Sequence, residues 1–513
     1  MNDLHATRTP AAAAVRAQRV VLFGLDAVSW DVVDRVETAM PTLARLRREG
    51  AVGTLLSTLP PITPVAWTSM VTGVGPGRHG VYEFVHRTER GWRPVTRREV
   101  RSAALDEILE RHGMPSILVN LPVSHPGRSR AVRLQDFLSP DPEVVYPAEL
   151  RQRAPEIAAY RPFYAPGAIA DRSVEEAAAE VLDLERRRLA AALYLLRHEP
   201  WRFVFYGVTG TDHLQHRALD LILGPGPVPE AVLAVYREVD RALAAVLDEM
   251  RPGDLLVVAS DHGSAVMRRE FFLNEWLVRQ GLARWRQAPA GAAPGRGGGM
   301  AAAVRRAAFA LGLDRRTAAI RRRLGLRLNL GGGPLAAVDE EGSAAYMPAS
   351  FAWPALYAPG ADPRQLADRL AEVRDPETGE KVFALARTGE EVYGPDRAPG
   401  APDVVLLPAP GMAVHPGRGG VLVRAAHKNH HKREGILLLY GARPAGLGRD
   451  LGERAVEDVA PTVLAALGIG VPEEMEGSAL FPPPPDEAAR RAVRSALARL
   501  GLGARPTRAR EGA

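Results

Sequence analysis

Short apolar segments alternate with longer segments of helical periodicity along most of the chain. The apolar runs are residues 19–25, 116–121, 202–208 and 254–260. The helical patterns are residues 29–48, 103–112, 174–197 and 229–250. A helix that connects two successive strands brings the chain back to the end of the sheet where the first strand began, so the two strands run parallel. The alternation therefore predicts an α/β fold with a mostly parallel central sheet flanked by helices.

The alternation stops near residue 266, which indicates an inserted segment. A Gly-, Ala- and Arg-rich stretch at about 291–333 and mixed elements up to residue 402 follow, and the alternation resumes at 403–407. We therefore expect a core of residues 19–265 and 403–482, with residues 266–402 as an inserted smaller cap domain. Residues 1–18 and 483–513 are expected to form a disordered N-terminus and a C-terminal tail.

The composition limits which chemistry is possible. The 513 residues include no cysteine, so any metal ion must be bound by His, Asp, Glu or hydroxyl groups. The net charge is +6, and residues 296–327 contain nine arginines and one acid. This basic segment could attract an anionic substrate, although a solvated helix face explains it more simply. It has few interleaved aromatic residues, so we expect no specific nucleic-acid binding.

The chain also has no segment typical of membrane insertion or export. No stretch approaches 18 uninterrupted apolar residues, and residues 1–18 contain no apolar run of signal-peptide length. We therefore expect a protein without a transmembrane segment that is located in the cytoplasm. The sequence does not indicate its oligomeric state.

Acidic and histidine residues follow three of the predicted strands. Asp26 and Asp261 each come directly after an apolar run and Asp212 comes four residues after the end of another, with His262 next to Asp261 and His216 four residues beyond Asp212. Functional groups in parallel α/β sheets gather beyond the carboxyl ends of the strands. Two ligands four residues apart share one face of a helix, which suits binding to one ion. Singly, each residue is explained by a helix cap or a turn, but together they predict a metal site.

Thr63 lies at the start of a predicted helix between these acids. Thr63 and Pro64 resemble an N-cap followed by a first-turn proline, with the helix extending to about Val71. The backbone N–H groups and the dipole at such a helix start favour a bound phosphate. The hydroxyl of Thr63 could equally be only a helix cap, so the pattern leaves a catalytic and a structural role open.

Five segments in order resemble the motifs of a known superfamily. They are GLDAVSWDVV, TPVAWTSMVTG, TDHLQH, SDHG and HKREGILLLYG. The chain is similar over residues 19–482 to the alkaline phosphatase superfamily, and within it to the type I phosphodiesterase and nucleotide pyrophosphatase family. The resemblance implies an alkaline phosphatase-like core.

The resemblance also implies two divalent metal ions. Their ligands would be Asp26, Asp261, His262 and the Thr63 oxygen for one ion, and Asp212, His216 and His431 for the other. Zn²⁺ suits this mixture of nitrogen and oxygen ligands, and Mn²⁺ is a credible substitute. We choose His431 over His427 and His430 because it begins the match to the late histidine motif.

The implied function is hydrolysis of a small phosphate ester through a phosphothreonine on Thr63, with a phosphodiesterase favoured over a phosphomonoesterase. One departure concerns Ala66, which stands where nucleotide pyrophosphatases have an asparagine that binds a non-bridging oxygen. It leaves nucleotide specificity open. The alternatives are a phosphomonoesterase, a phosphotransferase or mutase with the same intermediate, and a metal-free binding scaffold with a basic cap.

Overall fold

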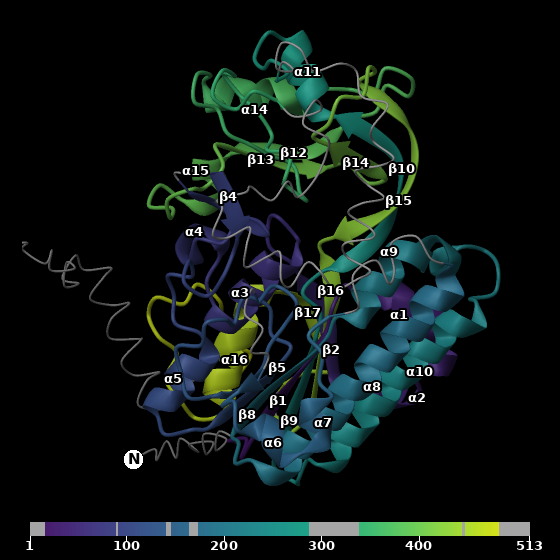
Figure 1. The fold of residues 1–513 in the computed structure, drawn as a ribbon, viewed down its shortest axis with the longest axis vertical. Coiled ribbons are helices and arrows are strands. Elements are labelled where there is room, and N and C mark those ends of the chain that lie inside the picture. Colours follow the sequence, from purple (N-terminus) through teal and green to yellow (C-terminus); the bar gives the residue numbers. More distant parts are fainter. Residues whose placement is uncertain are drawn as a thin grey trace, which may run out of the picture.

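The computed structural model describes residues 16–88, 91–139, 145–163, 173–286, 338–443 and 447–481. A larger lobe contains a nine-stranded sheet, and a smaller lobe contains two three-stranded sheets (Figure 1). The predicted Arg/Gly-rich stretch at 291–333 and the predicted tail at 483–513 lie outside the described residues, as do residues 1–15 of the predicted disordered N-terminus.

The central sheet has the strand order β17-β2-β16-β9-β1-β8-β5-β6-β7. Its strands are β1 (Val20–Leu25), β2 (Ala51–Leu56), β5 (Ser116–Val119), β6 (Val132–Leu134), β7 (Val145–Tyr146), β8 (Phe203–Val208), β9 (Leu255–Ala259), β16 (Glu434–Gly441) and β17 (Asp450–Ala455). β1 pairs in parallel with both β8 and β9, and β5 pairs in parallel with β8 and β6. β16 runs antiparallel to its neighbours β9 and β2. The predicted α/β fold with a mostly parallel sheet is confirmed.

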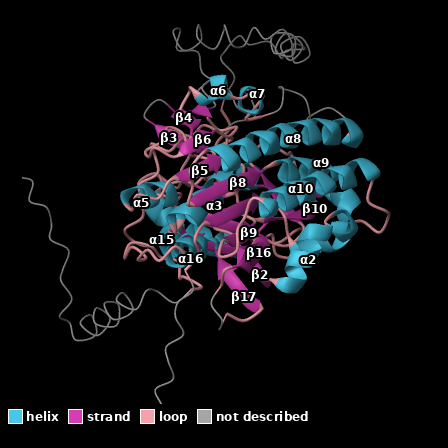
Figure 2. Cartoon of the chain, turned by 90° about the horizontal axis from the view of Figure 1, so that it is seen from below, coloured by secondary structure: helices cyan, strands magenta, loops and turns pink. Residues whose placement is uncertain are grey.

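Helices cover both faces of this sheet (Figures 1 and 2). One face packs against α1 (Trp30–Val36), α2 (Pro41–Glu49), α8 (Val174–His198), α9 (Gly210–Leu223) and α10 (Glu230–Asp248). The other packs against α3 (Thr63–Thr72), α5 (Leu105–Arg111) and α16 (Val459–Ala466). Along β1, Val21 and Phe23 face the first set while Val20 and Leu22 face the second. Burial on both faces explains the continuous apolar run of this strand.

The helix predicted over residues 29–48 is two helices in the structure. α1 ends at Val36, a short 3₁₀ turn covers Glu37–Ala39, and α2 begins at Pro41. Proline has no N–H to donate and restricts the residue before it, so it is disfavoured inside a helix and favoured in the first turn of a new one. The helical periodicity was therefore interpreted correctly, but its continuity was wrong.

The smaller lobe is built on two sheets with their own apolar core. One sheet contains β10 (Gly263–Phe272), β14 (Met412–His415) and β15 (Val423–Lys432), and the other contains β11 (Ala355–Leu356), β12 (Phe383–Thr388) and β13 (Val404–Pro408). The helices are α11 (Leu273–Arg279), α14 (Pro363–Ala371) and α15 (Gly389–Tyr393). β10 and β15 are long antiparallel strands that connect the two lobes (Figure 1).

The return of the chain to the central sheet differs from the predicted position. The sequence places it at residues 403–407, but β13 pairs with β11 and β12 in the smaller lobe. The first strand after the insertion that joins the central sheet is β16. A short buried apolar run has the same composition in either sheet, because both sheets are covered by apolar side chains, so sequence pattern alone did not distinguish them.

Glu83 connects the larger lobe to the segment that precedes β11. Its carboxylate accepts hydrogen bonds from the backbone N–H groups of Phe84 at 2.8 Å, Ala352 at 2.9 Å and Trp353 at 3.1 Å. The side chain is buried, and burial raises the pKa of Glu83 to about 7 although the three N–H groups favour its charged form. The connection between the lobes therefore contains a carboxyl group that titrates near neutral pH.

We expect Glu83→Gln to remove a pH-dependent loss of stability. In the wild type, the folded pKa of Glu83, about 7, lies above the ordinary value of 4.5. The contribution of Glu83 to the free energy of unfolding is therefore complete below pH 4.5 and is lost as the pH rises through about 7. The free energy of unfolding of the variant relative to wild type should therefore rise by about 3 kcal/mol across this interval. Urea denaturation of both proteins at several pH values measures it. An identical pH dependence in the two proteins would contradict this assignment.

Candidate metal centre

The aspartates and histidines predicted from the sequence come together at the carboxyl ends of the strands of the central sheet. Asp26 follows β1, Asp261 and His262 follow β9, Asp212 and His216 lie in the first two turns of α9 after β8, and His431 lies on β15. β1 lies between β8 and β9 in the sheet, so the three strand ends are adjacent. All six side chains are buried except that of His216, which is 41% exposed.

The first cluster consists of Asp26, Asp261 and His262. His262 Nε2 lies 3.3 Å from Asp261 Oδ2 and 3.7 Å from Asp26 Oδ1. Within the described residues, none of these three atoms has a hydrogen-bond partner of normal geometry. Burial raises the pKa of both carboxyl groups well above the ordinary value, the neighbouring carboxylates raise it further, and burial lowers the pKa of His262. Buried converging ligand atoms without partners fit a bound cation.

The second cluster consists of Asp212, His216 and His431. Asp212 Oδ1 lies 3.3 Å from His216 Nε2 and 3.4 Å from His431 Nε2, and the two ring nitrogens are 3.1 Å apart. Burial would raise the pKa of Asp212, but His216 and His431 lower it well below the ordinary value. Asp212 in turn raises the pKa of His216 to about 9. These three side chains therefore form a compact group of oxygen and nitrogen ligands.

The histidine rings are oriented by the backbone. His216 Nδ1 lies 3.2 Å from the carbonyl oxygen of Asn429, His431 Nδ1 lies 3.0 Å from that of Pro61, and His262 Nδ1 lies 3.2 Å from that of Gly263. A carbonyl oxygen only accepts, so each Nδ1 carries a proton, and Nε2 is the ring atom that each histidine offers to a cation when it is deprotonated. Metal-binding histidines commonly donate their second nitrogen in this way.

The two clusters are in direct contact. The rings of His262 and His431 stack with centroids 3.9 Å apart. Ligand atoms of Asp212, His262 and His431 all lie within 4.8 Å of one another, as do those of Asp26, Asp261 and His262. His216 belongs to neither of these closest triads, although it contacts Asp212. The clusters could bind metal ions, and their contact suits two neighbouring cations.

Thr63 is the first residue of α3 rather than the residue before it. Ile62 occupies the N-cap position in an extended conformation, and Pro64 lies in the first turn as predicted. Thr63 is a buried residue, and among the residues that the structure describes its hydroxyl has no hydrogen-bond partner. The hydrogen bond from His431 to Pro61 connects the second cluster to the segment that leads into Thr63. The helix-cap interpretation of Thr63 was therefore wrong by one position.

Several groups around the clusters were not identified from the sequence. Trp67, one turn beyond Thr63 on α3, points its Nε1 at Asp26 Oδ2 from 3.5 Å. The N–H of Ala27 donates to Asp261 Oδ1 at 3.2 Å. Ala27 has a φ of 64°, a left-handed conformation that residues other than glycine rarely adopt. Trp67 lies four residues after Thr63 in the segment TPVAWTSMVTG, and this helical spacing could have indicated that both residues share one face of α3. Nothing in the sequence indicates the backbone conformation of Ala27.

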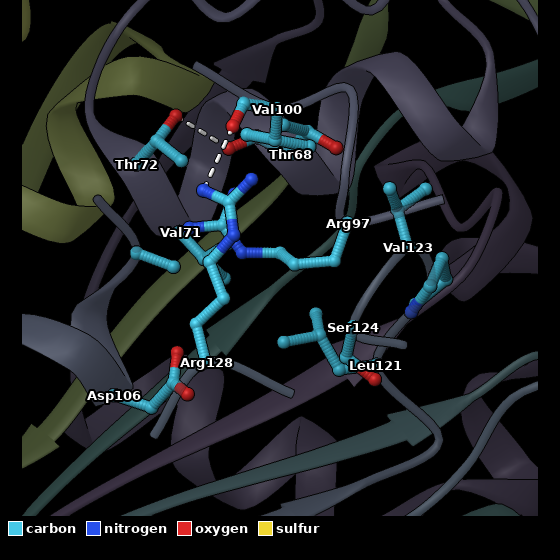
Figure 3. Close-up of a pocket in the computed structure, with 12 residues that line it drawn as sticks. Thr68, Val71, Thr72, Arg97, Val100, Asp106, Leu121, Val123, Ser124 and Arg128 are labelled. Atoms are coloured by element: carbon cyan, nitrogen blue, oxygen red, sulfur yellow. Dashed lines mark hydrogen bonds between the residues drawn. The ribbon is translucent and has the colours of Figure 1, made fainter. Parts of the chain in front are cut away.

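A small cavity behind α3 is separate from these clusters (Figure 3). Its volume is about 20 Å³, which suits one water molecule. Thr68, Thr72, Arg97 and Arg128 are among its lining residues, and none of the predicted ligands lines it. Arg97 pairs with Glu107 through Nε and Nη2, while its Nη1 has no partner within the described part of the chain. This cavity does not contribute to the metal centre.

The sheet topology and its flanking helices give the chain an alkaline phosphatase-like fold. The fold is similar to that of phosphonoacetate hydrolase from Sinorhizobium meliloti 1021 in complex with phosphonoformate, with a TM-score of 0.53 and 15% identity over 88% of this chain and 96% of that chain. It is also similar to murine ectonucleotide pyrophosphatase/phosphodiesterase 5, solved as an inactive threonine-to-alanine variant in complex with AMP, with a TM-score of 0.51 and 12% identity over 90% of this chain and 97% of that chain.

The sequence model of the type I phosphodiesterase/nucleotide pyrophosphatase family matches residues 20–435. The chain belongs to this family and is a phosphoryl hydrolase. No curated protein matches the chain by sequence. Among the described helices, none is both long enough and apolar enough to cross a bilayer.

Proposed function

We propose that this phosphoryl hydrolase is a metal-dependent phosphodiesterase that acts on small phosphate esters through a phosphothreonine at Thr63. The observation that carries the proposal is the convergence of three histidine Nε2 atoms and buried carboxylate oxygens. The N–H at each Nδ1 donates to a backbone carbonyl, and that of His431 donates to Pro61, two residues before Thr63. This arrangement buries ligand atoms that have no hydrogen-bond partner among the described residues, which costs free energy. A metal-free scaffold would have no need for it.

The donor set fits two divalent cations. Asp26, Asp261, His262 and the Thr63 oxygen would bind one ion, and Asp212, His216 and His431 would bind the other. Zn²⁺ fits these ligands and Mn²⁺ is an acceptable substitute, since three of the seven side chains are carboxylates. When bound, such cations lower the pKa of the Thr63 hydroxyl and neutralise negative charge on the phosphoryl oxygens.

Thr63 is the nucleophile in this proposal. Its oxygen forms a bond to phosphorus while the bond from phosphorus to the leaving oxygen breaks, and the hydroxyl proton passes through solvent to the leaving group. Water then displaces the threonine oxygen from phosphorus and regenerates the hydroxyl. Two in-line displacements give net retention at phosphorus. Within the described part of the chain the hydroxyl of Thr63 has no hydrogen-bond partner, so it can take part without breaking a structural hydrogen bond.

The similar murine structure supports a threonine nucleophile, because its threonine-to-alanine variant is described as inactive. Ala66 offers no side-chain donor to a non-bridging oxygen, so we do not propose specificity for nucleotides. We propose that the smaller lobe, joined to the site by β10 and β15, acts as a cap that selects the leaving group. The cytoplasmic location expected from the sequence stays a prediction.

The proposal is tested by comparing bis-p-nitrophenyl phosphate with p-nitrophenyl phosphate as substrates. We expect faster cleavage of the diester with Zn²⁺ or Mn²⁺, complete loss of turnover after chelation, and recovery when metal is returned. Preference for the monoester would favour a phosphomonoesterase or phosphotransferase. Phosphonoacetate is a useful third substrate, because a protein of similar fold binds it. Failure of the metal-loaded protein to cleave any of them would contradict the proposed nucleophile and ligands.

A further inference from the structure

The three residues before Asp212 are each held by a side-chain hydrogen bond. Arg188 Nη1 donates to the hydroxyl of Thr209 at 2.7 Å, and the N–H of Gly210 donates to Glu185 Oε1 at 2.9 Å. The hydroxyl of Thr211 donates to the backbone carbonyl of Asp26 at 2.6 Å. Each of the three residues that lead into Asp212 at the start of α9 is therefore fixed by a hydrogen bond to another part of the chain.

Glu185 and Arg188 form a buried ion pair on α8 that provides two of these anchors. Arg188 Nη1 lies 2.8 Å from Glu185 Oε1, and both side chains are buried. A side chain at Gly210 would collide with α8, because an added Cβ would lie 2.6 Å from Val181 Cγ1 and 2.9 Å from Glu185 Oε1. α8 and α9 thus approach closely at this point, and the first turn of α9 has little freedom to move on that side.

The third anchor reaches across to the other ligand cluster. Thr211 is fully buried, and its hydroxyl contacts the carbonyl of Asp26, the residue directly after β1 and 185 positions earlier in the chain. The N–H of Asp26 donates to the carbonyl of Val208 at 3.0 Å, so the backbone of Asp26 is bound to the β8–α9 connection through both of its polar groups. Asp26 and Asp212 belong to different clusters, and Thr211 is the side chain that joins their backbones.

This contact differs from those of other buried threonines in helices. Thr68, Thr72 and Thr462 each donate to the carbonyl four residues earlier in the chain. Such bonds satisfy the hydroxyl locally and leave the position of the helix undetermined. The hydroxyl of Thr211 instead donates at 2.6 Å to the carbonyl of Asp26, just after β1, although it also lies 3.3 Å from the carbonyl of Val208.

We propose that Thr211 is a positioning residue that sets the spacing between the two metal-binding clusters. The inference rests on the proposed function, because it requires both clusters to bind metal. Metal sites tolerate errors of only about 0.5 Å in ligand position. Removing a supporting hydrogen bond around a metal site typically lowers affinity about 10- to 100-fold. Without the hydroxyl, the first turn of α9 can shift relative to Asp26.

The test compares Thr211→Val with Thr211→Ser by equilibrium Mn²⁺ binding and by electron paramagnetic resonance of the Mn²⁺ pair. Valine keeps the shape and removes the donor, whereas serine keeps the donor. We expect wild type and the serine variant to bind two coupled ions with affinities within about 3-fold of each other. The valine variant should bind the second ion about 10-fold or more weakly and lose the coupled signal.

A matched control separates positioning from stability. Thr462→Val removes another buried hydroxyl that donates to a carbonyl at 2.6 Å, in α16, which carries none of the proposed ligands, and should leave Mn²⁺ binding unchanged. Equal affinity and coupling in Thr211→Val and wild type would overturn the inference, as would a serine variant that behaves like valine. Thr211→Ala provides the same comparison if the valine variant does not fold. Wild-type protein that binds fewer than two ions would overturn the proposed function as well.

Discussion

Replacing Thr63 by alanine is expected to lower kcat roughly 10⁴-fold or more, because the nucleophile of the proposed reaction is lost. The change removes a hydroxyl that has no hydrogen-bond partner among the described residues, so the melting temperature should stay close to that of wild type. The Asp and His ligands remain, so metal content should stay near two ions per chain. Steady-state kinetics, calorimetry and elemental analysis of one preparation measure the three quantities.

Thr63→Ser is the matched control for the nucleophile. Serine retains the hydroxyl, so it should keep much of the activity that alanine loses. Acid quenching of wild type during turnover should trap a protein heavier by one phosphoryl group, with the added mass on the peptide that contains Thr63. Wild-type turnover by the alanine variant, or a phosphoryl group on another residue, would show that Thr63 is not the nucleophile.

Asp261→Asn is expected to remove the metal ion of the first cluster and to lower kcat/KM by at least about 100-fold. Loss of a residue that only hydrogen-bonds a metal ligand already costs up to about 100-fold, and Asp261 is a proposed ligand itself. Asparagine keeps an oxygen that can accept the N–H of Ala27, so the local fold should persist. Elemental analysis should find about one ion per chain in place of two.

The same substitution should stabilise the metal-free protein at neutral pH. Burial, together with neighbouring carboxylates, raises the folded pKa of Asp26 and Asp261 above the ordinary value of 3.8. The stability associated with each carboxyl group is therefore complete below pH 3.8 and is lost as the pH rises through its folded pKa. Asparagine carries no charge, so the variant escapes part of this loss. Melting temperatures after chelation should be higher for the variant, and lower after metal is added.

Asp136→Asn is the matched control for Asp261. Asp136 is another buried acid just beyond the carboxyl end of a parallel strand, β6, and burial raises its pKa to about 7. Its carboxylate accepts the N–H of Leu138 at 2.7 Å, and we do not propose it as a ligand. This variant should retain both ions. If Asp261→Asn also retained two ions and full activity, the proposed first cluster would be wrong.

The sequence predicted the elements of the larger lobe more accurately than their grouping. The strands expected at 202–208 and 254–260 are β8 and β9, and the helices expected at 174–197 and 229–250 are α8 and α10. These segments are long or uniformly apolar, so local pattern was sufficient. The strand at 404–408 was predicted, but it was assigned to the central sheet. No local sequence feature indicates which of two sheets an apolar strand will join.

The candidate ligands were predictable for a related reason. Asp26, Asp212 and Asp261 follow strands of one parallel sheet, and the chemistry of ligand types at strand ends is encoded locally. Their geometry was not predictable. The left-handed conformation of Ala27, the three carbonyl groups that orient the histidines, and the bond from Thr211 to Asp26 all depend on packing around the strand ends.

The sequence by itself therefore determined the α/β class, the order of the motifs and the residue types available for chemistry, because periodicity and strand-end residues are properties of short segments. Only the tertiary structure decided that His431, on a strand that connects the two lobes, meets Asp212 and His216 of α9, and that Thr211 joins the two clusters. Those contacts link residues about 185 to 220 positions apart, and contacts of 2.6–3.4 Å form only after the strands have fixed the backbone positions.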